Sequence, residues 1–141
     1  MNNVITKNEP LFSNSTLALL LRVILAIIFI AHGSQKVFGA FGGYGLQGTT
    51  QWMTTQLGIP LFLAYASCFI ELFSGIGLLF GLGSRVWGLL LAGQMLVAMS
   101  TAHNGFFAPG GVEFPLSLFF LSLAVTITGS GSYSLDKFLA K

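Results

Sequence analysis

Three polar side chains interrupt long apolar runs of this sequence, where burial is costly unless such groups are paired or serve a purpose. Arg22, Glu71 and Gln94 each lie well inside an apolar run. At about 1.5 Å of rise per helical residue, Arg22 would lie roughly 10 Å from one end of its run, and Glu71 and Gln94 roughly 15 Å from the corresponding ends of theirs. We therefore predict an Arg22–Glu71 ion pair whose hydrogen bonds Gln94 completes. A structural role in fixing helix register is favoured over catalysis or a proton relay.

A second polar group is predicted where the apolar runs end. Its members are His32 and Lys36, one helical turn apart at the end of the first run, His103 at the end of the third, and Glu113 at the start of the fourth. Imidazole and carboxylate are ligand types for metal ions, but no HxxxH or HExxH spacing accompanies them. We therefore expect no metal site, and predict a mildly polar mouth that holds a small ligand. For each histidine alone, an ordinary interfacial residue is the favoured interpretation.

The composition indicates that these apolar runs face lipid as well as the protein interior. Of 141 residues, 54% are hydrophobic and only 7% are charged, and the mean hydropathy is +0.83. So few charged side chains cannot cover a soluble domain, which carries roughly a quarter charged residues. The formal net charge of +2 provides no basic patch, so nucleic acid is excluded as a partner. The single cysteine, Cys68, excludes an intrachain disulfide and a cysteine-rich metal site. The sequence predicts an integral membrane protein.

Four apolar windows are long enough to cross a bilayer, which takes about 20 helical residues. They run over about 16–33, 59–81, 85–102 and 114–128. Continuous apolar runs indicate helices, since barrel strands would alternate. A cleaved signal peptide is the less favoured interpretation of the first window, because Arg22 interrupts it and no small-x-small cleavage site follows. We predict an all-α membrane protein, a single domain over 1–141 that forms an antiparallel four-transmembrane-helix bundle.

The loops and flanking charges predict how the bundle is oriented. Lys7, Arg85, Lys137 and Lys141 fall on one side, and Lys36 alone falls on the other. Because cytoplasmic loops carry an excess of Lys and Arg, both termini are expected in the cytoplasm. The first loop, 37–60, contains glycines 39, 42, 43, 45 and 48, which we expect to prevent a regular helix there. Residues 49–57 are predicted to form a short interfacial helix, with Trp52 at headgroup depth.

Helical spacing predicts which faces point inward. In the first window, Arg22, Ala26, Phe29, Gly33 and Lys36 share one face. In the second, a face of mostly small residues contains Ala64, Ser67, Cys68, Glu71, Ser74, Gly75 and Leu78. Small side chains let helices approach closely, so these two faces are expected to meet.

Several segments in this order resemble the DoxX family of bacterial membrane proteins. They are LRVILAIIFIAHGSQKVFG, GLQGTTQWMTTQLGIP, FIELFSGIGLLFGLGSRVWGLLLAGQMLVAMSTAH and the final GSGSYSLD, and together they cover about residues 17–136. The resemblance implies a four-helix, multi-pass protein of the bacterial inner membrane. The family includes relatives of a thiosulfate:quinone oxidoreductase subunit, and the resemblance itself transfers no catalytic residue to this chain.

The first functional hypothesis is a membrane subunit of a quinone-linked redox system. Any electron transfer would have to use a bound quinone, a flavin or a partner's redox centre, and quinone is the cofactor that this hypothesis names. The candidate ligand-binding residues are Arg22, His32, Lys36, Glu71, Gln94, His103 and Glu113. A quinone carbonyl needs hydrogen-bond donors and a quinol needs a proton acceptor, for which Glu71 and His103 are the candidate catalytic groups.

Two other hypotheses come from different classes. A non-enzymatic membrane partner or assembly factor would dock other membrane or redox proteins through the glycine-rich outer loops and Trp52. A small-solute transporter of this length would have to be a homo-oligomer, and no pair of broken helices indicates one. The bundle interior distinguishes the first two, because a pocket of about 300 Å³ or more favours a ligand and a packed interior favours a structural role.

Overall fold

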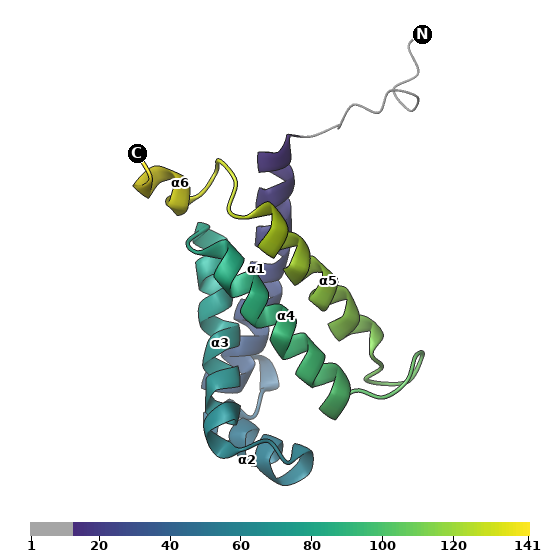
Figure 1. Ribbon diagram of the computed structural model, residues 1–141. Coiled ribbons are helices and arrows are strands. Elements are labelled where there is room, and N and C mark those ends of the chain that lie inside the picture. The colour runs from purple at the N-terminus through teal and green to yellow at the C-terminus, as the bar shows by residue number, and fades with distance from the viewer. Residues whose placement is uncertain (1–12) are drawn as a thin grey trace.

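The computed structural model describes residues 13–141, and all of its regular elements in that range are helices (Figure 1). They are α1 (Asn14–Phe38), the short 3-10 helix η2 (Ala40–Gly42), α2 (Gly45–Leu57), α3 (Leu61–Phe80), α4 (Ser84–Thr101), α5 (Glu113–Thr128) and α6 (Leu135–Leu139). The four predicted windows coincide with α1, α3, α4 and α5. Lys7, which the charge count used, lies outside the described residues.

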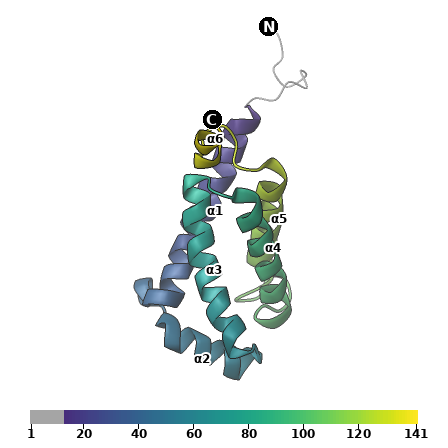
Figure 2. The same ribbon diagram turned by 60° about the vertical axis from the view of Figure 1, so that its left-hand side comes forward.

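The long helices pack as two pairs. α1 packs along α3 and α4 packs along α5, with far fewer contacts between the two pairs (Figures 1 and 2). From the end where the tight α3–α4 turn lies, the pairs diverge toward the opposite end, and α2 lies across that opposite end beside α3. The described part of the N-terminal helix starts at the same end as α6, as the ribbon shows.

Glycines let α1 and α3 approach closely. A Cβ atom added to Gly33 would lie 2.7 Å from the backbone nitrogen of Leu72, and one added to Gly75 would lie 2.8 Å from the backbone nitrogen of Ile30. Both distances are too short for any side chain, so the two backbones are in contact at these points. The predicted small-residue face of the second window is confirmed, since Ala64, Cys68 and Ser74 on it are also buried.

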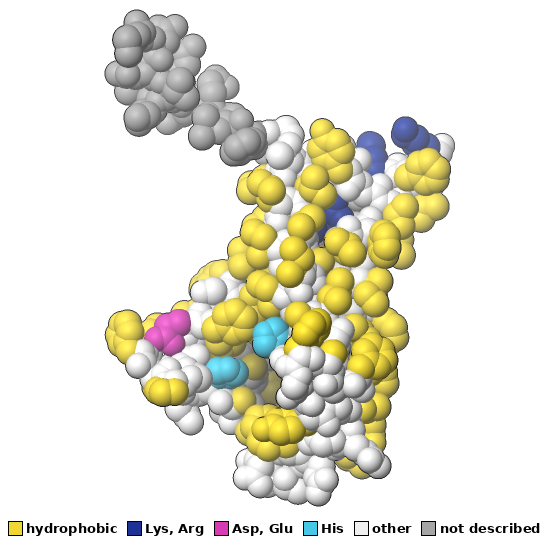
Figure 3. Space-filling model, turned by 180° about the vertical axis from the view of Figure 1, so that it is seen from behind, with side chains coloured by type: hydrophobic (Ala, Val, Ile, Leu, Met, Phe, Trp, Pro, Cys, Tyr) yellow, Lys and Arg dark blue, Asp and Glu magenta, His cyan; other side chains and the backbone are white. Residues whose placement is uncertain are grey.

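The inward face predicted for the first window is confirmed as well. Arg22, Ala26, Phe29 and Gly33 are buried, and Lys36 is partly exposed on the same side. The opposite side of the helix exposes large aliphatic residues such as Leu20, Ile24 and Ile27. Hydrophobic side chains cover most of the surface between the two ends of the molecule (Figure 3). Within the described residues, α1 and α3 are long and apolar enough to cross a membrane, and α5 is a shorter apolar helix.

The first loop is more helical than predicted. α2 begins at Gly45 rather than at residue 49, so the expectation that glycines 45 and 48 prevent a regular helix is wrong. Gly45, with φ +71°, is the entry residue of the helix, where a left-handed residue costs no internal hydrogen bond. α1 likewise continues through Lys36 to Phe38, where Gly39 at φ +70° ends it. This extension keeps Lys36 on the helical face of Gly33.

The glycine contacts between α1 and α3 generate a stability prediction. Gly33→Ala or Gly75→Ala should lower the free energy of unfolding by about 1–3 kcal/mol, because the added methyl group must push two backbones apart. Gly93→Ala is the matched control, since a Cβ there meets nothing within 4 Å and alanine favours the helix. Thermal unfolding of the detergent-solubilised variants measures the difference. Equal stability of all three variants would contradict the close approach.

Candidate functional site

A cavity of about 660 Å³ lies between the two helix pairs, toward the end of the bundle where α2 lies. This volume lies within the range of about 300–1,000 Å³ that is typical of ligand pockets. Most of its wall is apolar, with Phe29, Met53, Leu57, Ile70, Met95 and Leu118 among the lining residues. Five helices contribute to it, so the bundle interior is hollow at this end rather than closely packed.

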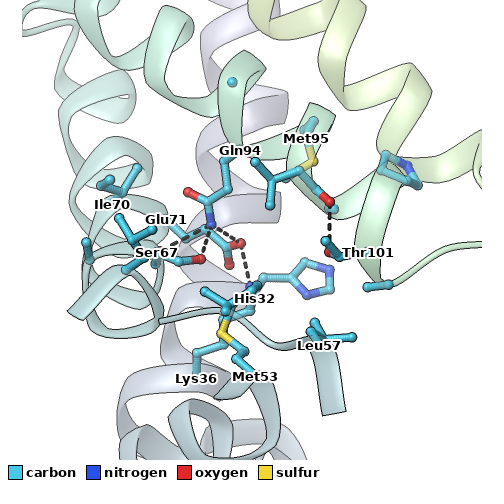
Figure 4. A pocket seen from close by; sticks show the side chains of 18 of the residues that line it. His32, Lys36, Met53, Leu57, Ser67, Ile70, Glu71, Gln94, Met95 and Thr101 are labelled. Atoms are coloured by element: carbon cyan, nitrogen blue, oxygen red, sulfur yellow. Dashed lines mark hydrogen bonds and ion pairs between the residues drawn. The ribbon is translucent and has the colours of Figure 1, made fainter. Parts of the chain in front are cut away.

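A buried ion pair forms the most polar part of the cavity. Glu71 on α3 is only 3% exposed, and its Oε1 accepts from Lys36 Nζ at 2.5 Å and from Gln94 Nε2 at 2.7 Å (Figure 4). Gln94 also donates to the Ser67 hydroxyl at 2.7 Å. Among the cavity-lining residues of α3, Glu71 is the one farthest along the chain from α2. The cluster therefore places two opposite charges and an amide in the otherwise apolar wall of the pocket.

Two acceptor atoms of this cluster have no hydrogen bond within the described chain. Glu71 Oε2 and Gln94 Oε1 are both buried and accept from no protein group in residues 13–141. The amide orientation of Gln94 follows from its neighbours, because its nitrogen faces three oxygen atoms of Ser67 and Glu71. Buried polar atoms are nearly always hydrogen-bonded in native proteins, so each of these atoms calls for a donor.

Both histidines of the predicted mouth line the cavity. His103 Nδ1 lies 3.0 Å from the carbonyl oxygen of Ala98, so this nitrogen carries the proton and, in the neutral ring, Nε2 is left as an acceptor. The His32 ring packs against Phe114, with ring centroids 5.9 Å apart. The two histidine side chains are visible on one face, in the lower half of the molecule (Figure 3). Within residues 13–141, no group of three or more His, Cys, Asp or Glu side chains is arranged to hold a metal ion.

Glu113 is not brought into the cavity. It starts α5, and its Oε1 accepts from the backbone nitrogen of Phe107 in the loop between α4 and α5. Its carboxylate thus holds that loop closed, and the side chain of Phe107 at its tip is 96% exposed. Of the predicted outer group, the structure brings together His32, Lys36 and His103, and it adds Glu71 and Gln94.

Arg22 is likewise outside the cavity, and the predicted Arg22–Glu71 ion pair is wrong. The Arg22 side chain is completely buried, and it donates to the carbonyl oxygens of Leu78 at 2.9 Å and Tyr133 at 2.6 Å. The reason is register. Because Gly33 lies against Leu72, Glu71 is level with the last turns of α1, where Lys36 is within reach. By the same antiparallel count, Arg22 is level with the C-terminal end of α3, whose carbonyl groups lack helical partners.

The C-terminal segment completes the arginine site. The Asp136 carboxylate accepts from the Gly83 backbone nitrogen at 2.9 and 3.0 Å and from the Ser130 hydroxyl at 2.5 Å. Its backbone nitrogen also donates to the carbonyl oxygen of Gly81 at 3.2 Å. The Ser130 hydroxyl and then the Gly83 N–H hold the pKa of the Asp136 carboxyl below its ordinary value, and the nearby charge of Arg22 acts in the same direction. This cluster fastens the chain end to the α3–α4 turn.

Most of the apolar wall of the cavity could not be predicted from residue types. Met53, Leu57, Met95 and Leu118 line it, but their types are indistinguishable from the many apolar residues that pack or face outward. Phe29, predicted on the inward face of the first window, and Trp52, singled out for headgroup depth, also prove to be lining residues. The partners of Arg22 are backbone carbonyl groups, which every residue has, so the residue types along the sequence could not identify them.

An apolar outer surface, a helical bundle and a pocket that contains a partly buried ion pair define a helical membrane protein with an internal cavity. The chain belongs to the DoxX family, whose model matches residues 17–104. It is 37% identical over 123 residues to a Bacillus subtilis (strain 168) protein named "Putative oxidoreductase CatD", covering 87% of each chain. It is 33% identical over 131 residues to "Inner membrane protein YqjF" of Escherichia coli (strain K12), covering 87% of this chain and 92% of the other. No solved structure matches the chain significantly.

The Asp136 cluster predicts an acid-sensitive chain end. Since the folded-state pKa of Asp136 is lowered, its stabilising contribution is complete above its unfolded-state pKa and is lost as the pH falls through the lower, folded-state value. Asp136→Asn should therefore be less stable than wild type at neutral pH, and this difference should shrink as the pH falls through that window. Thermal unfolding across a pH series measures it.

Ser130→Ala is the matched variant, because it removes the largest cause of the lowered pKa and keeps the charge. It should move the acid transition upward, toward the ordinary pH range of an aspartate. A difference between Asp136→Asn and wild type that stays constant with pH would contradict this assignment.

Proposed function

We propose that this DoxX-family chain is a multi-pass protein of the bacterial inner membrane whose cavity binds the head group of a quinone, as the membrane subunit of a redox system. The names of the two relatives, one an oxidoreductase and one an inner membrane protein, support this assignment. The carrying observation is the cavity itself, which contains a Lys36–Glu71 ion pair within apolar walls.

The lengths of the four long helices support four membrane spans. α1, α3 and α4 contain 25, 20 and 18 residues, so each is about 27 Å or longer and matches the roughly 30 Å hydrocarbon core. α5 has 16 residues, and at about 24 Å it reaches across with its flanking loop residues inside the interface.

Charge supports an orientation with both termini in the cytoplasm. Arg85 follows the α3–α4 turn, and Lys137 and Lys141 lie in and after α6, at the same end of the bundle. All Lys and Arg side chains visible on the face in Figure 3 lie in its upper half. Because Lys36 at the other half is paired with Glu71, the excess of free positive charge is at one end, which the positive-inside rule assigns to the cytoplasm.

The chemistry of the cavity suits a quinone head group. The ammonium group of Lys36 has donors beyond the one used on Glu71 and can donate to a ring carbonyl. Glu71 and the Nε2 atom of His103 are acceptors for the protons of the reduced form. Methionine and aromatic walls, among them Met53, Met95 and Phe29, suit a flat ring with an aliphatic tail. Arg22 is not part of this site, and its contacts assign it to holding the bundle together.

A docking role is the second candidate, and one observation favours it. Phe107 is 96% exposed and Phe41 is 78% exposed, and both have positive φ angles, 63° and 52°. Backbones that hold large aromatic side chains outward in a strained conformation are typical of recognition surfaces. Under this alternative, a substitution at Phe107 would release a protein partner and leave ligand binding in the cavity unchanged.

The cavity hypothesis predicts a specific loss in one carboxylate variant. Glu71→Gln should weaken binding of decylubiquinone about tenfold or more, because the lost charge no longer holds the Lys36 donor in place and a charged hydrogen bond contributes roughly 1.5–3 kcal/mol. Titration of the protein in lipid nanodiscs, against empty nanodiscs, measures the affinity.

Glu113→Gln is the matched control, since it removes the same charge from a carboxylate outside the cavity. It should bind as wild type does. Equal affinity of the Glu71→Gln and wild-type proteins would contradict the proposed site, and absence of binding to wild type would contradict the proposed function.

A further inference from the structure

One side of the cavity lies between α3 and α4, and exposed lining residues such as Trp52 on α2 and Phe114 on α5 mark further openings. Leu63 on α3 and Leu90 and Val97 on α4 line the cavity on this side, and they are 46%, 41% and 49% exposed. Residues that face both the cavity and the exterior form the rim of an opening. This opening is therefore on the side of the bundle, between two helices of different pairs, where the pairs diverge (Figure 1).

Gly93 leaves the middle of this rim unfilled. It lines the cavity, it is exposed, and a Cβ atom added to it would meet nothing within 4 Å. Gly93 lies midway along the 18 residues of α4, about 13 Å from either end of the helix. If α4 crosses the membrane, as proposed above, this gap faces hydrocarbon chains rather than water.

The polar cluster of the cavity offers acceptors to a ligand. Glu71 Oε2 and Gln94 Oε1 are buried with no donor from the described chain. A head group with hydroxyls can donate to Glu71 Oε2 and accept from Lys36 at the same time. A carbonyl can accept from Lys36 but has no proton for either orphaned oxygen.

We infer that the cavity takes its ligand from the lipid phase through the α3–α4 opening at Gly93, and that it binds the hydroxylated, reduced form of a quinone in preference to the oxidised form. The orphaned acceptors select the hydroxyls of the head group, and the lateral opening admits an aliphatic tail. This inference rests on the proposed function and adds to it the entry route and the redox form.

The redox-form preference is tested with decylubiquinol and decylubiquinone, titrated anaerobically into the wild-type protein in nanodiscs. The quinol should bind about tenfold more tightly, since leaving a buried acceptor without a donor costs about 1–3 kcal/mol. Glu71→Gln should reduce this ratio toward one. Equal binding of the two forms, or tighter binding of the quinone, would overturn the inferred preference while leaving quinone binding itself established.

The entry route is tested with Gly93→Leu, whose side chain would extend into the opening from a position with free space around its Cβ. Association of decylubiquinol should slow several-fold, while the affinity for 2,3-dimethoxy-5-methyl-1,4-benzoquinol, which has no tail, should stay as in wild type. Stopped-flow mixing with nanodiscs measures the first, and equilibrium titration measures the second.

Leu89→Phe is the matched control, because it adds bulk to an exposed position of α4 that does not line the cavity. Its association rate should equal that of wild type, and melting temperatures of both variants should show an intact fold. An unchanged association rate in Gly93→Leu would overturn the lateral route, and so would an equal loss of the tailless quinol, because that result would place the new side chain in the head-group site.

Discussion

The architecture of this protein depends on how one carboxylate is neutralised inside an apolar bundle. Glu71 is buried in the middle of α3, where an unpaired charge would destabilise the packed helix pair. Lys36 reaches it from the last turns of α1 and Gln94 from α4, so the cluster joins three helices at one point. The side chains of this cluster do not fill the space between the two helix pairs. The pairs diverge toward the end where α2 lies, and the cavity remains between them.

The antiparallel register of α1 and α3 determines why Arg22 and Lys36 have different partners. Gly33 and Gly75 let the two backbones touch, and this contact fixes which residues are level with one another. Lys36 is thereby placed at the cavity, whereas Arg22 is placed at the end of α3, where its guanidinium satisfies carbonyls of α3 and of the C-terminal segment. One end of the bundle is therefore closed by polar contacts between distant parts of the chain, and the other end is open.

Helical periodicity was sufficient to predict the four long helices and the inward faces of α1 and α3, because a buried stripe repeats along the sequence. It was insufficient to pair Arg22 and Glu71 with their partners. Arg22 and Lys36 are nearly four helical turns apart, about 21 Å along the axis, and the count of depth from the ends of each run did not include the register that the Gly33–Leu72 contact sets. Lys36 was predicted at the mouth because the first helix was expected to end at residue 33. In the structure, α1 continues to Phe38 and Gly39 caps it. The cavity itself could not be predicted, because Met53 or Leu118 beside an empty volume looks the same in sequence as in a packed core.

The most direct test of the central ion pair is a double-mutant cycle on the free energy of unfolding in mixed micelles, with Lys36→Met and Glu71→Gln alone and together. A coupling energy of about 0.5–3 kcal/mol is expected for this pair, and additivity to within about 0.5 kcal/mol is expected for the parallel cycle of Arg22→Gln and Glu71→Gln. Additive effects in the first cycle combined with coupling in the second would contradict the pairing described here, and would return Arg22 to the partnership that the sequence suggested.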